Sequence, residues 1–112
     1  MGQLMRLVPA AIFVAIVTLT LPAFARAQSD VDKVYKTHCV LCHAPDGSGS
    51  SPSGKALKAQ DLRSDSAQKK SDAELAEAIS HGRGKMPAFG KKLKPEDIQQ
   101  LVTFIRALAK SK

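Results

Sequence analysis

The two cysteines of this chain both lie in one short pattern, Cys39-Val40-Leu41-Cys42-His43. Two thiols three positions apart can add to the two vinyl groups of one porphyrin. The histidine directly after the second thiol is then placed under the ring, where it can bind the iron. A cysteine pair followed by histidine in this way is the attachment pattern of a c-type haem. The pattern therefore predicts one covalent haem, attached through Cys39 and Cys42, with His43 as an iron ligand.

Other uses of a cysteine pair fit the sequence less well. A zinc site usually needs a second pair of cysteines or histidines at matching spacing, whereas His38 and His81 are scattered. A thioredoxin-like redox pair would lie in a βαβ unit, and the flanks here have the pattern of helix and of Gly/Ser-rich loop. A thiol oxidoreductase or a disulfide without haem is the alternative that a visible spectrum would test.

The first 27 residues have the pattern of a secretory signal peptide. Arg6 gives a short positive region, and residues 7–21 are apolar except for two threonines. Two A-x-A sequences compete as cleavage sites, and we favour cleavage after Ala27 because it leaves a polar start at Gln28. We expect an exported, periplasmic domain over residues 28–112, since thioether formation takes place outside the bacterial cytoplasm. The alternative is an uncleaved anchor, but about 15 apolar residues are short for a span that needs about 20.

The mature part of the chain is one small domain that needs help to fold. At this size, burial of side chains and chain entropy nearly balance, so small domains usually need a metal, a disulfide or a cofactor. The aromatic residues of this part are only Tyr35, Phe89 and Phe104. Burial of a porphyrin face would contribute on the order of 10 kcal/mol as an upper value. We therefore expect the haem to be structural as well as functional.

Helix patterns follow one another along the mature chain, and strand patterns are absent. Ser29 with Asp32 forms a capping box ahead of a helix that runs up to the cysteine motif. Residues 44–54 form a loop, and a weak turn follows at 56–59. A second helix begins after Ser71 and ends at Gly82, and a third begins at Pro95. The apolar stripe of the third helix consists of Ile98, Leu101, Val102, Ile105 and Leu108. The sequence predicts an all-α fold.

Three segments together resemble a small monohaem class I cytochrome c of the bacterial type. They are Cys39, Cys42 and His43; Gly82-Arg83-Gly84-Lys85-Met86-Pro87-Ala88-Phe89; and the terminal amphipathic helix that begins at Pro95. The resemblance covers essentially the whole mature region and implies the cytochrome c fold, with three to four helices wrapped around one haem. It also implies that the terminal helices cross near the haem, with His43 below the iron and Met86 above it. The chain departs from longer relatives in its short loop after His43.

The context of Met86 supports its implied role as the second ligand. Gly82 and Gly84 give a flexible approach, and Pro87 stiffens the chain after the sulfur. A methionine in core packing is the competing interpretation. His81 is the rival ligand, although we prefer to place it at a helix end, near the terminal carbonyls.

Two further residues near the motif each have two possible interpretations. His38 is expected at the surface or as a hydrogen-bond donor. The carbonyl of Pro52 is a candidate acceptor for the free N–H of His43, as a loop proline is in relatives. Simple stiffening of the loop by Pro52 is the equal alternative.

This ligand set predicts a one-electron carrier and not an enzyme, because both axial positions of the iron are filled. The net charge of +7 falls to +5 once Arg6 and Arg26 leave with the signal peptide. Five basic residues fall in an acid-free span, Arg83, Lys85, Lys91, Lys92 and Lys94. We expect a monomer with no stable membrane insertion, redox donor and acceptor proteins with acidic docking surfaces, and no nucleic-acid partner. The alternatives are a haem gas sensor with an open distal site and an electron-entry subunit of a membrane complex.

Overall fold

The computed structural model describes the backbone of residues 21–111, together with their side chains except at residues 21–25 and 29. Residues 1–20, which hold most of the expected signal peptide, lie outside this range. The helices are α2 (Leu21–His38), α3 (Val40–His43), α4 (Pro52–Leu57), α5 (Asp65–Gln68), α6 (Asp72–His81) and α7 (Pro95–Leu108), followed by the 3₁₀ helix η2 (Ala109–Ser111). The described residues contain no strand, only an isolated bridge between Arg83 and Met86. The expectation of an all-α fold is confirmed.

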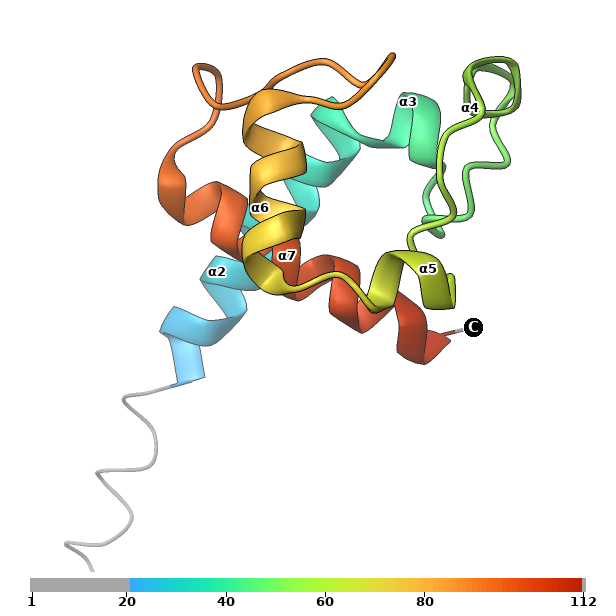
Figure 1. Cartoon of the computed structure of the whole chain (residues 1–112). Helices are drawn as coiled ribbons and strands as arrows, with labels where there is room; N and C mark the ends of the chain where they lie inside the picture. The colour runs from blue at the N-terminus through green and yellow to red at the C-terminus, as the bar shows by residue number, and fades with distance from the viewer. Residues whose placement is uncertain (1–20, 112) are drawn as a thin grey trace, which may run out of the picture.

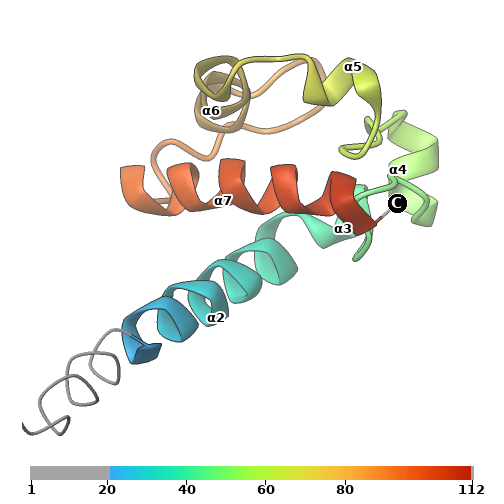
Figure 2. The same ribbon diagram turned by 90° about the horizontal axis from the view of Figure 1, so that it is seen from below.

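Helix α7 is the element on which the two other long helices pack. It contacts α2 along one side and α6 along another, although α2 and α7 are far apart in the sequence. Figure 1 shows α6 in front of α7, and Figure 2 shows α7 lying across α2 with the two axes inclined. The rings of Tyr35 on α2 and Phe104 on α7 stack at this crossing, with centroids 4.6 Å apart. The first and last long helices, α2 and α7, are therefore joined through aromatic packing.

The apolar core is built largely from the stripe on α7 that the sequence predicts. Its residues Ile98, Leu101, Val102 and Ile105 are buried, and Leu108 packs against them from the edge. The other buried members of the same cluster are Val31, Tyr35, Leu75, Ile79, Phe89 and Leu93. Burial of each such aliphatic side chain contributes about 1.5–3 kcal/mol, so this stripe decides the position of α7.

The ends of α6 and α7 lie where the sequence places them. Ser71 and Glu74 form the predicted capping box, with each side chain bonded to the backbone amide of the other residue. Gly82 follows the last residue of α6 with φ = 74°, a conformation that favours glycine. Asp97 accepts a hydrogen bond from the amide of Lys94 and so caps the start of α7.

Two sequence predictions about the helices are wrong. Helix α2 extends from Leu21 to His38 and runs through Ser29, so the Ser29–Asp32 pair does not mark its start. The residues ahead of Ser29 are themselves helical, and their carbonyls are available to the amides one turn later. The expected cleavage site after Ala27 lies within this helix. Helix α4 begins at Pro52, inside the predicted loop, because the Ser51 hydroxyl accepts a hydrogen bond from the Gly54 amide.

Arg106 fixes the turn between α5 and α6 to the end of α7. Its guanidinium donates to the carbonyl of Gln68 at 2.9 Å and to that of Lys70 at 2.6 Å. It also forms an ion pair with Asp72 at 2.8 Å. A planar group with five donors can bind several acceptors in one turn of chain, which a lysine cannot do. The position of α6 beside α7 therefore depends on polar contacts as well as on the core.

The described helices include none that is long and apolar enough to cross a membrane.

Candidate haem site

One turn of chain brings the three residues of the cysteine motif together. Cys39 precedes the short helix α3, and its carbonyl accepts hydrogen bonds from the amides of Cys42 (3.2 Å) and His43 (2.9 Å). Residues three and four positions apart lie on the same side of such a turn. Both cysteines are free thiols and half-buried. The motif thus presents two thiols and one imidazole from a single rigid turn, as attachment to one porphyrin requires.

Cys39 connects the cysteine motif to the core of the protein. It packs against the hydrophobic core cluster, and its amide donates to the carbonyl of Tyr35 at 2.9 Å. Burial raises the pKa of the Cys39 thiol to about 11. The side chain is therefore a neutral thiol at physiological pH, beside apolar groups that a porphyrin face can cover.

His43 is held in the tautomer that an iron ligand needs. Its Nδ1 lies 3.0 Å from the carbonyl oxygen of Gln60. A carbonyl oxygen only accepts, so Nδ1 carries the proton and Nε2 keeps its lone pair. Burial lowers the pKa of His43 and so favours the neutral ring, and the hydrogen bond to Gln60 partly opposes this effect. A hydrogen bond from the other ring nitrogen of a ligand histidine fixes both the ring orientation and the nitrogen that binds the metal.

The partner of His43 differs from the one considered in the sequence analysis. The carbonyl that faces Nδ1 belongs to Gln60 and not to Pro52. Pro52 is instead the first residue of α4, where its missing amide and fixed φ suit the helix start. This position fits the interpretation that Pro52 stiffens the chain. It does not fit the interpretation that the Pro52 carbonyl accepts the N–H of His43.

The loop after His43 folds back onto the cysteine motif. The amide of Gly49 donates to the carbonyl of His43 at 2.8 Å, and the hydroxyl of Ser51 lies 2.7 Å from the carbonyl of Leu41. Gly54 allows α4 to pack directly on α3, since a Cβ at this position would overlap the carbonyl oxygen of Cys42. The chain after His43 therefore encloses the motif on one side. Its continuation beyond α4 places the Gln60 carbonyl beside His43.

Met86 lies in a tight turn after α6. Arg83 and Met86 exchange two backbone hydrogen bonds of 3.1 and 2.9 Å, and Gly84 has φ = 55° within the turn. The Met86 side chain is half-buried and packs against the same core cluster as Cys39. A Cβ on Gly82 would lie 2.5 Å from the carbonyl oxygen of Met86. Figure 1 shows this segment (orange) crossing the top of the molecule over α6.

The two remaining histidines do not join the site. His81 is exposed at the end of α6, and its Nδ1 lies 3.1 Å from the carboxylate of Glu77 one turn earlier. This pairing with a side chain replaces the expected contact with terminal carbonyls. His38 is half-buried and lies edge-on to Phe89, with centroids 5.6 Å apart. The expectation of His38 as a surface group or hydrogen-bond donor therefore misses its aromatic packing.

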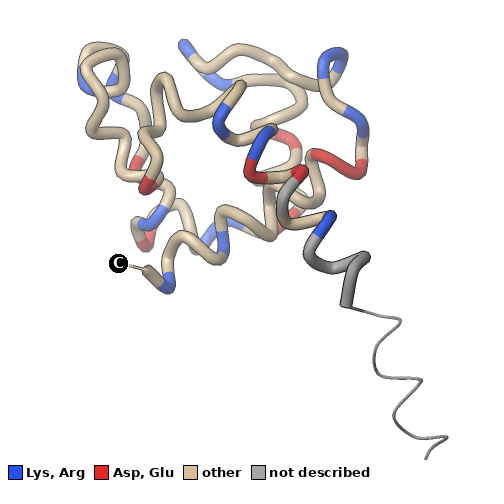
Figure 3. The backbone as a smooth tube through the Cα atoms, turned by 180° about the vertical axis from the view of Figure 1, so that it is seen from behind, with Lys and Arg blue, Asp and Glu red and all other residues tan. Residues whose placement is uncertain are grey.

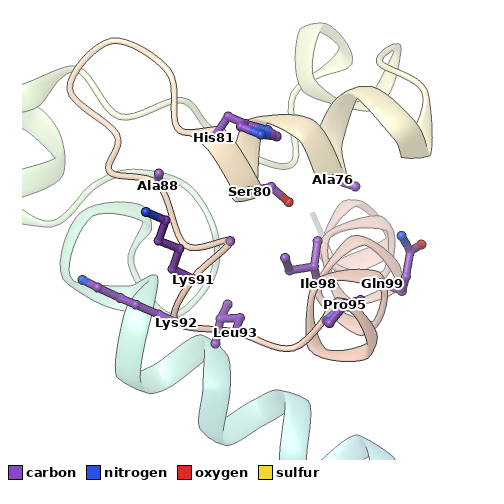
Figure 4. Close-up of a pocket in the computed structure, with 11 residues that line it drawn as sticks. Ala76, Ser80, His81, Ala88, Lys91, Lys92, Leu93, Pro95, Ile98 and Gln99 are labelled. Atoms are coloured by element: carbon purple, nitrogen blue, oxygen red, sulfur yellow. The ribbon is translucent and has the colours of Figure 1, made fainter.

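A cavity of about 770 Å³ lies beside α6, between this helix, the segment after Ala88 and the start of α7. Leu93 and Ile98 give it an apolar part, and Lys91 and Lys92 lie at its edge (Figure 4). None of Cys39, Cys42, His43 and Met86 lines it. The sequence analysis did not anticipate this cavity, which arises where the end of α6, the segment before Pro95 and the start of α7 meet.

The cysteine motif and Met86 together fit a c-type haem. Two free thiols lie on one turn, a neutral imidazole offers Nε2, and a half-buried thioether packs on the same core as Cys39. Each of these donors has the chemistry that haem attachment or iron ligation needs.

Comparison with known proteins gives the same class. A family profile described as cytochrome c oxidase, cbb3-type, subunit III matches residues 26–105. Cytochrome c6 of Gloeothece citriformis is 33% identical over 85 residues, which cover 75% of this chain and 74% of that protein. Cytochrome c6 of Porphyra purpurea is 31% identical over 80% of this chain and 79% of its own. A solved structure of the KustC0563 c-type cytochrome is similar with a TM-score of 0.64 and 34% identity, over 69% of this chain and 94% of that one.

The chain belongs to the cytochrome c family and is a small class I monohaem cytochrome c. It is an electron-transfer protein that uses a c-type haem. The resemblance noted from the sequence and the cytochrome c fold that it implies are both confirmed.

Two glycine substitutions test how the turn of Met86 is closed. Gly82→Ala should lower the free energy of unfolding by about 3 kcal/mol, because it combines a positive φ with overlap of the Met86 carbonyl. Gly84→Ala is the matched control, with a positive φ but open space around the added Cβ, and should cost about 1 kcal/mol. Denaturant unfolding of the two variants gives the comparison. Equal losses would show that the contact between Gly82 and Met86 does not support the turn.

Proposed function

We propose that this chain is a periplasmic one-electron carrier whose haem is attached through Cys39 and Cys42 and ligated by His43 and Met86. The observation that carries the proposal is the hydrogen bond between His43 Nδ1 and the Gln60 carbonyl. It leaves Nε2 as the only free nitrogen of a neutral ring that follows two thiols on one turn. The haem would supply an iron that alternates between its ferric and ferrous states.

Met86 is the proposed second ligand because its turn is held rigidly and its side chain packs toward the core. A thioether ligand favours ferrous iron and so raises the reduction potential. His43 and Met86 would both bind the iron, and these two side chains would leave no position on it for a substrate. The remaining activity is electron transfer through an exposed edge, with partners that bind briefly over a small area.

Export and processing complete the proposal. The leader over residues 1–27 would be removed, leaving residues 28–112 as the cytochrome domain in the periplasm. The basic residue, apolar stretch and A-x-A sequences of the leader support this. A second candidate is an electron-entry subunit of a membrane complex, which the match to the family of cbb3-type cytochrome c oxidase subunit III favours. Recovery with the membrane fraction, with Met1 retained, would identify the subunit.

Replacement of Met86 by alanine tests the ligand pair. The haem should stay attached because Cys39, Cys42 and His43 are unchanged, but the distal position should open and the reduction potential should fall. The far-red charge-transfer band of the oxidised protein should disappear, and the ferrous protein should bind carbon monoxide readily. Visible spectra and a redox titration give these readouts.

His81→Ala is the control, since its ring is exposed and paired with Glu77, and it should leave the spectrum unchanged. If His81→Ala opens the site and Met86→Ala does not, the iron is ligated by two histidines. Rapid carbon monoxide binding by the wild-type protein would favour the gas sensor over the carrier.

The docking surface for redox partners is proposed to include the basic residues of the 83–94 span. Lys91 and Lys92 are both exposed and lie at the edge of the cavity beside α6 (Figure 4). Figure 3 shows the basic positions of this span along the loops at the top of the molecule. The Lys92 ammonium lies 5.7 Å from the centre of the Phe89 ring, which holds this charge near the apolar cluster. A partner with carboxylates around an apolar contact would match this surface.

Charge reversal tests the docking surface. The double variant Lys91→Glu/Lys92→Glu should slow association with an acidic redox partner about tenfold at low salt, because electrostatic steering changes on-rates by about 10 to 1,000 times. It should also flatten the dependence of the rate on ionic strength, since exposed charges are screened beyond about 8 Å at physiological salt. Stopped-flow electron transfer measures both effects.

Lys69→Glu/Lys110→Glu is the control with the same change in net charge. These two side chains are exposed near α5 and the C-terminal end, on the opposite side of the molecule from the 83–94 span (Figure 1). Equal slowing by the two double variants would show that net charge matters and that no local docking surface exists there.

A further inference from the structure

The residue directly after His43 has an unusual backbone conformation. Ala44 is buried and has φ = 65° and ψ = 163°. This region is populated almost only by glycine, because the Cβ of other residues meets the backbone there. A non-glycine residue keeps such a conformation only when its surroundings impose it. Contacts beside the proposed iron ligand His43 must therefore hold Ala44 in this conformation.

Hydrogen bonds hold Ala44 on both sides. Its amide donates to the carbonyl of Val40 at 2.9 Å. Its carbonyl accepts from the amide of Gly47 at 3.1 Å and from the hydroxyl of Tyr35 at 2.8 Å. The Tyr35 bond is the shortest of the three, and it comes from α2, outside the loop. The bonds to Val40 and Gly47 join Ala44 only to residues close to it in the sequence. The bond from Tyr35 instead connects Ala44 to the place where α2 and α7 cross.

Tyr35 is itself fixed. Its side chain is 2% exposed, and its ring stacks on Phe104 of α7. Burial raises the pKa of its hydroxyl, so the group stays protonated and remains a donor. Its own carbonyl accepts the amide of Cys39 at 2.9 Å. One residue therefore contacts the motif at both ends, at Cys39 through its backbone and behind His43 through its hydroxyl.

We propose that Tyr35 is a positioning residue for the His43 ligand, acting through Ala44. The hydroxyl holds the Ala44 peptide in the conformation that only glycine adopts freely, and this fixes the direction in which the chain leaves His43. The imidazole then keeps Nδ1 on the Gln60 carbonyl and Nε2 available for ligation. This inference rests on the proposed role of His43 as an iron ligand.

The test uses the full haem-loaded protein and the variant Tyr35→Phe, which keeps the ring, its burial and the stack on Phe104. We expect the haem spectrum to stay low-spin, with the His43 Nδ1 proton exchanging with solvent about fivefold faster, the factor given by loss of one ordinary hydrogen bond. Proton NMR of the diamagnetic ferrous protein measures this rate. Phe104→Leu is the control, because it removes the ring stack but leaves the hydroxyl, and should lower stability without changing the rate.

A second variant separates positioning from general support of the core. Tyr35→Phe/Ala44→Gly places a residue at 44 that adopts the observed φ and ψ without strain. If Tyr35 acts by holding Ala44, this double variant should return the exchange rate to the wild-type value.

The proposal is overturned if Tyr35→Phe exchanges at the wild-type rate, or if Ala44→Gly fails to restore the rate. It is also overturned if Phe104→Leu accelerates exchange as much as Tyr35→Phe does. A failure of the proposed function is read separately, from the visible spectrum of the wild-type protein, which would then lack the bands of a low-spin haem.

Discussion

The hydrogen bond between His43 Nδ1 and the Gln60 carbonyl connects the sequence motif to the rest of the fold. It requires that the chain after the motif turn back, so the 44–62 segment lies against α3 rather than extending from it. Gly54 permits that close approach, and the Leu62 amide closes the far end of the segment on the Gly47 carbonyl at 2.8 Å. The short helix α4 and the loops on each side of it thus place the Gln60 carbonyl beside the His43 imidazole.

The two terminal helices cross close to the cysteine motif. Tyr35 lies one turn before Cys39 and stacks on Phe104, so the crossing of α2 and α7 is next to the haem motif. Met86 and Cys39 pack against one core cluster, whose main contributor is the stripe on α7. A domain this small has few large side chains, and the cofactor surface is expected to complete its core. Stability and haem binding are therefore properties of the same set of contacts.

The sequence predicts the parts of the molecule that depend on local signals. The capping box at Ser71, the glycine at 82 and the apolar stripe of α7 each lie within a few residues of the element they define. The cysteine motif is local as well, because its three side chains lie on one turn. These elements were predictable because neighbouring residues decide them.

Contacts between distant residues were not predictable in this way. The acceptor for His43 lies 17 residues along the chain, and a backbone carbonyl can come from any residue type, so the sequence carries no signal for Gln60. Arg106 shows only a helix-end charge in the sequence, yet it binds residues more than 30 positions earlier. The strained Ala44 likewise accepts a hydrogen bond from Tyr35 of α2, and alanine at that position gives no indication of this contact.

The most direct test of the account is the intact mass of the exported protein together with its thiol content. The account predicts a chain that begins at Gln28, carries the added mass of one haem after denaturation, and has no free thiol, since Cys39 and Cys42 are both used in thioether bonds. A chain of the unmodified mass with two free thiols, or one lighter by two hydrogens from a Cys39–Cys42 disulfide, would contradict it.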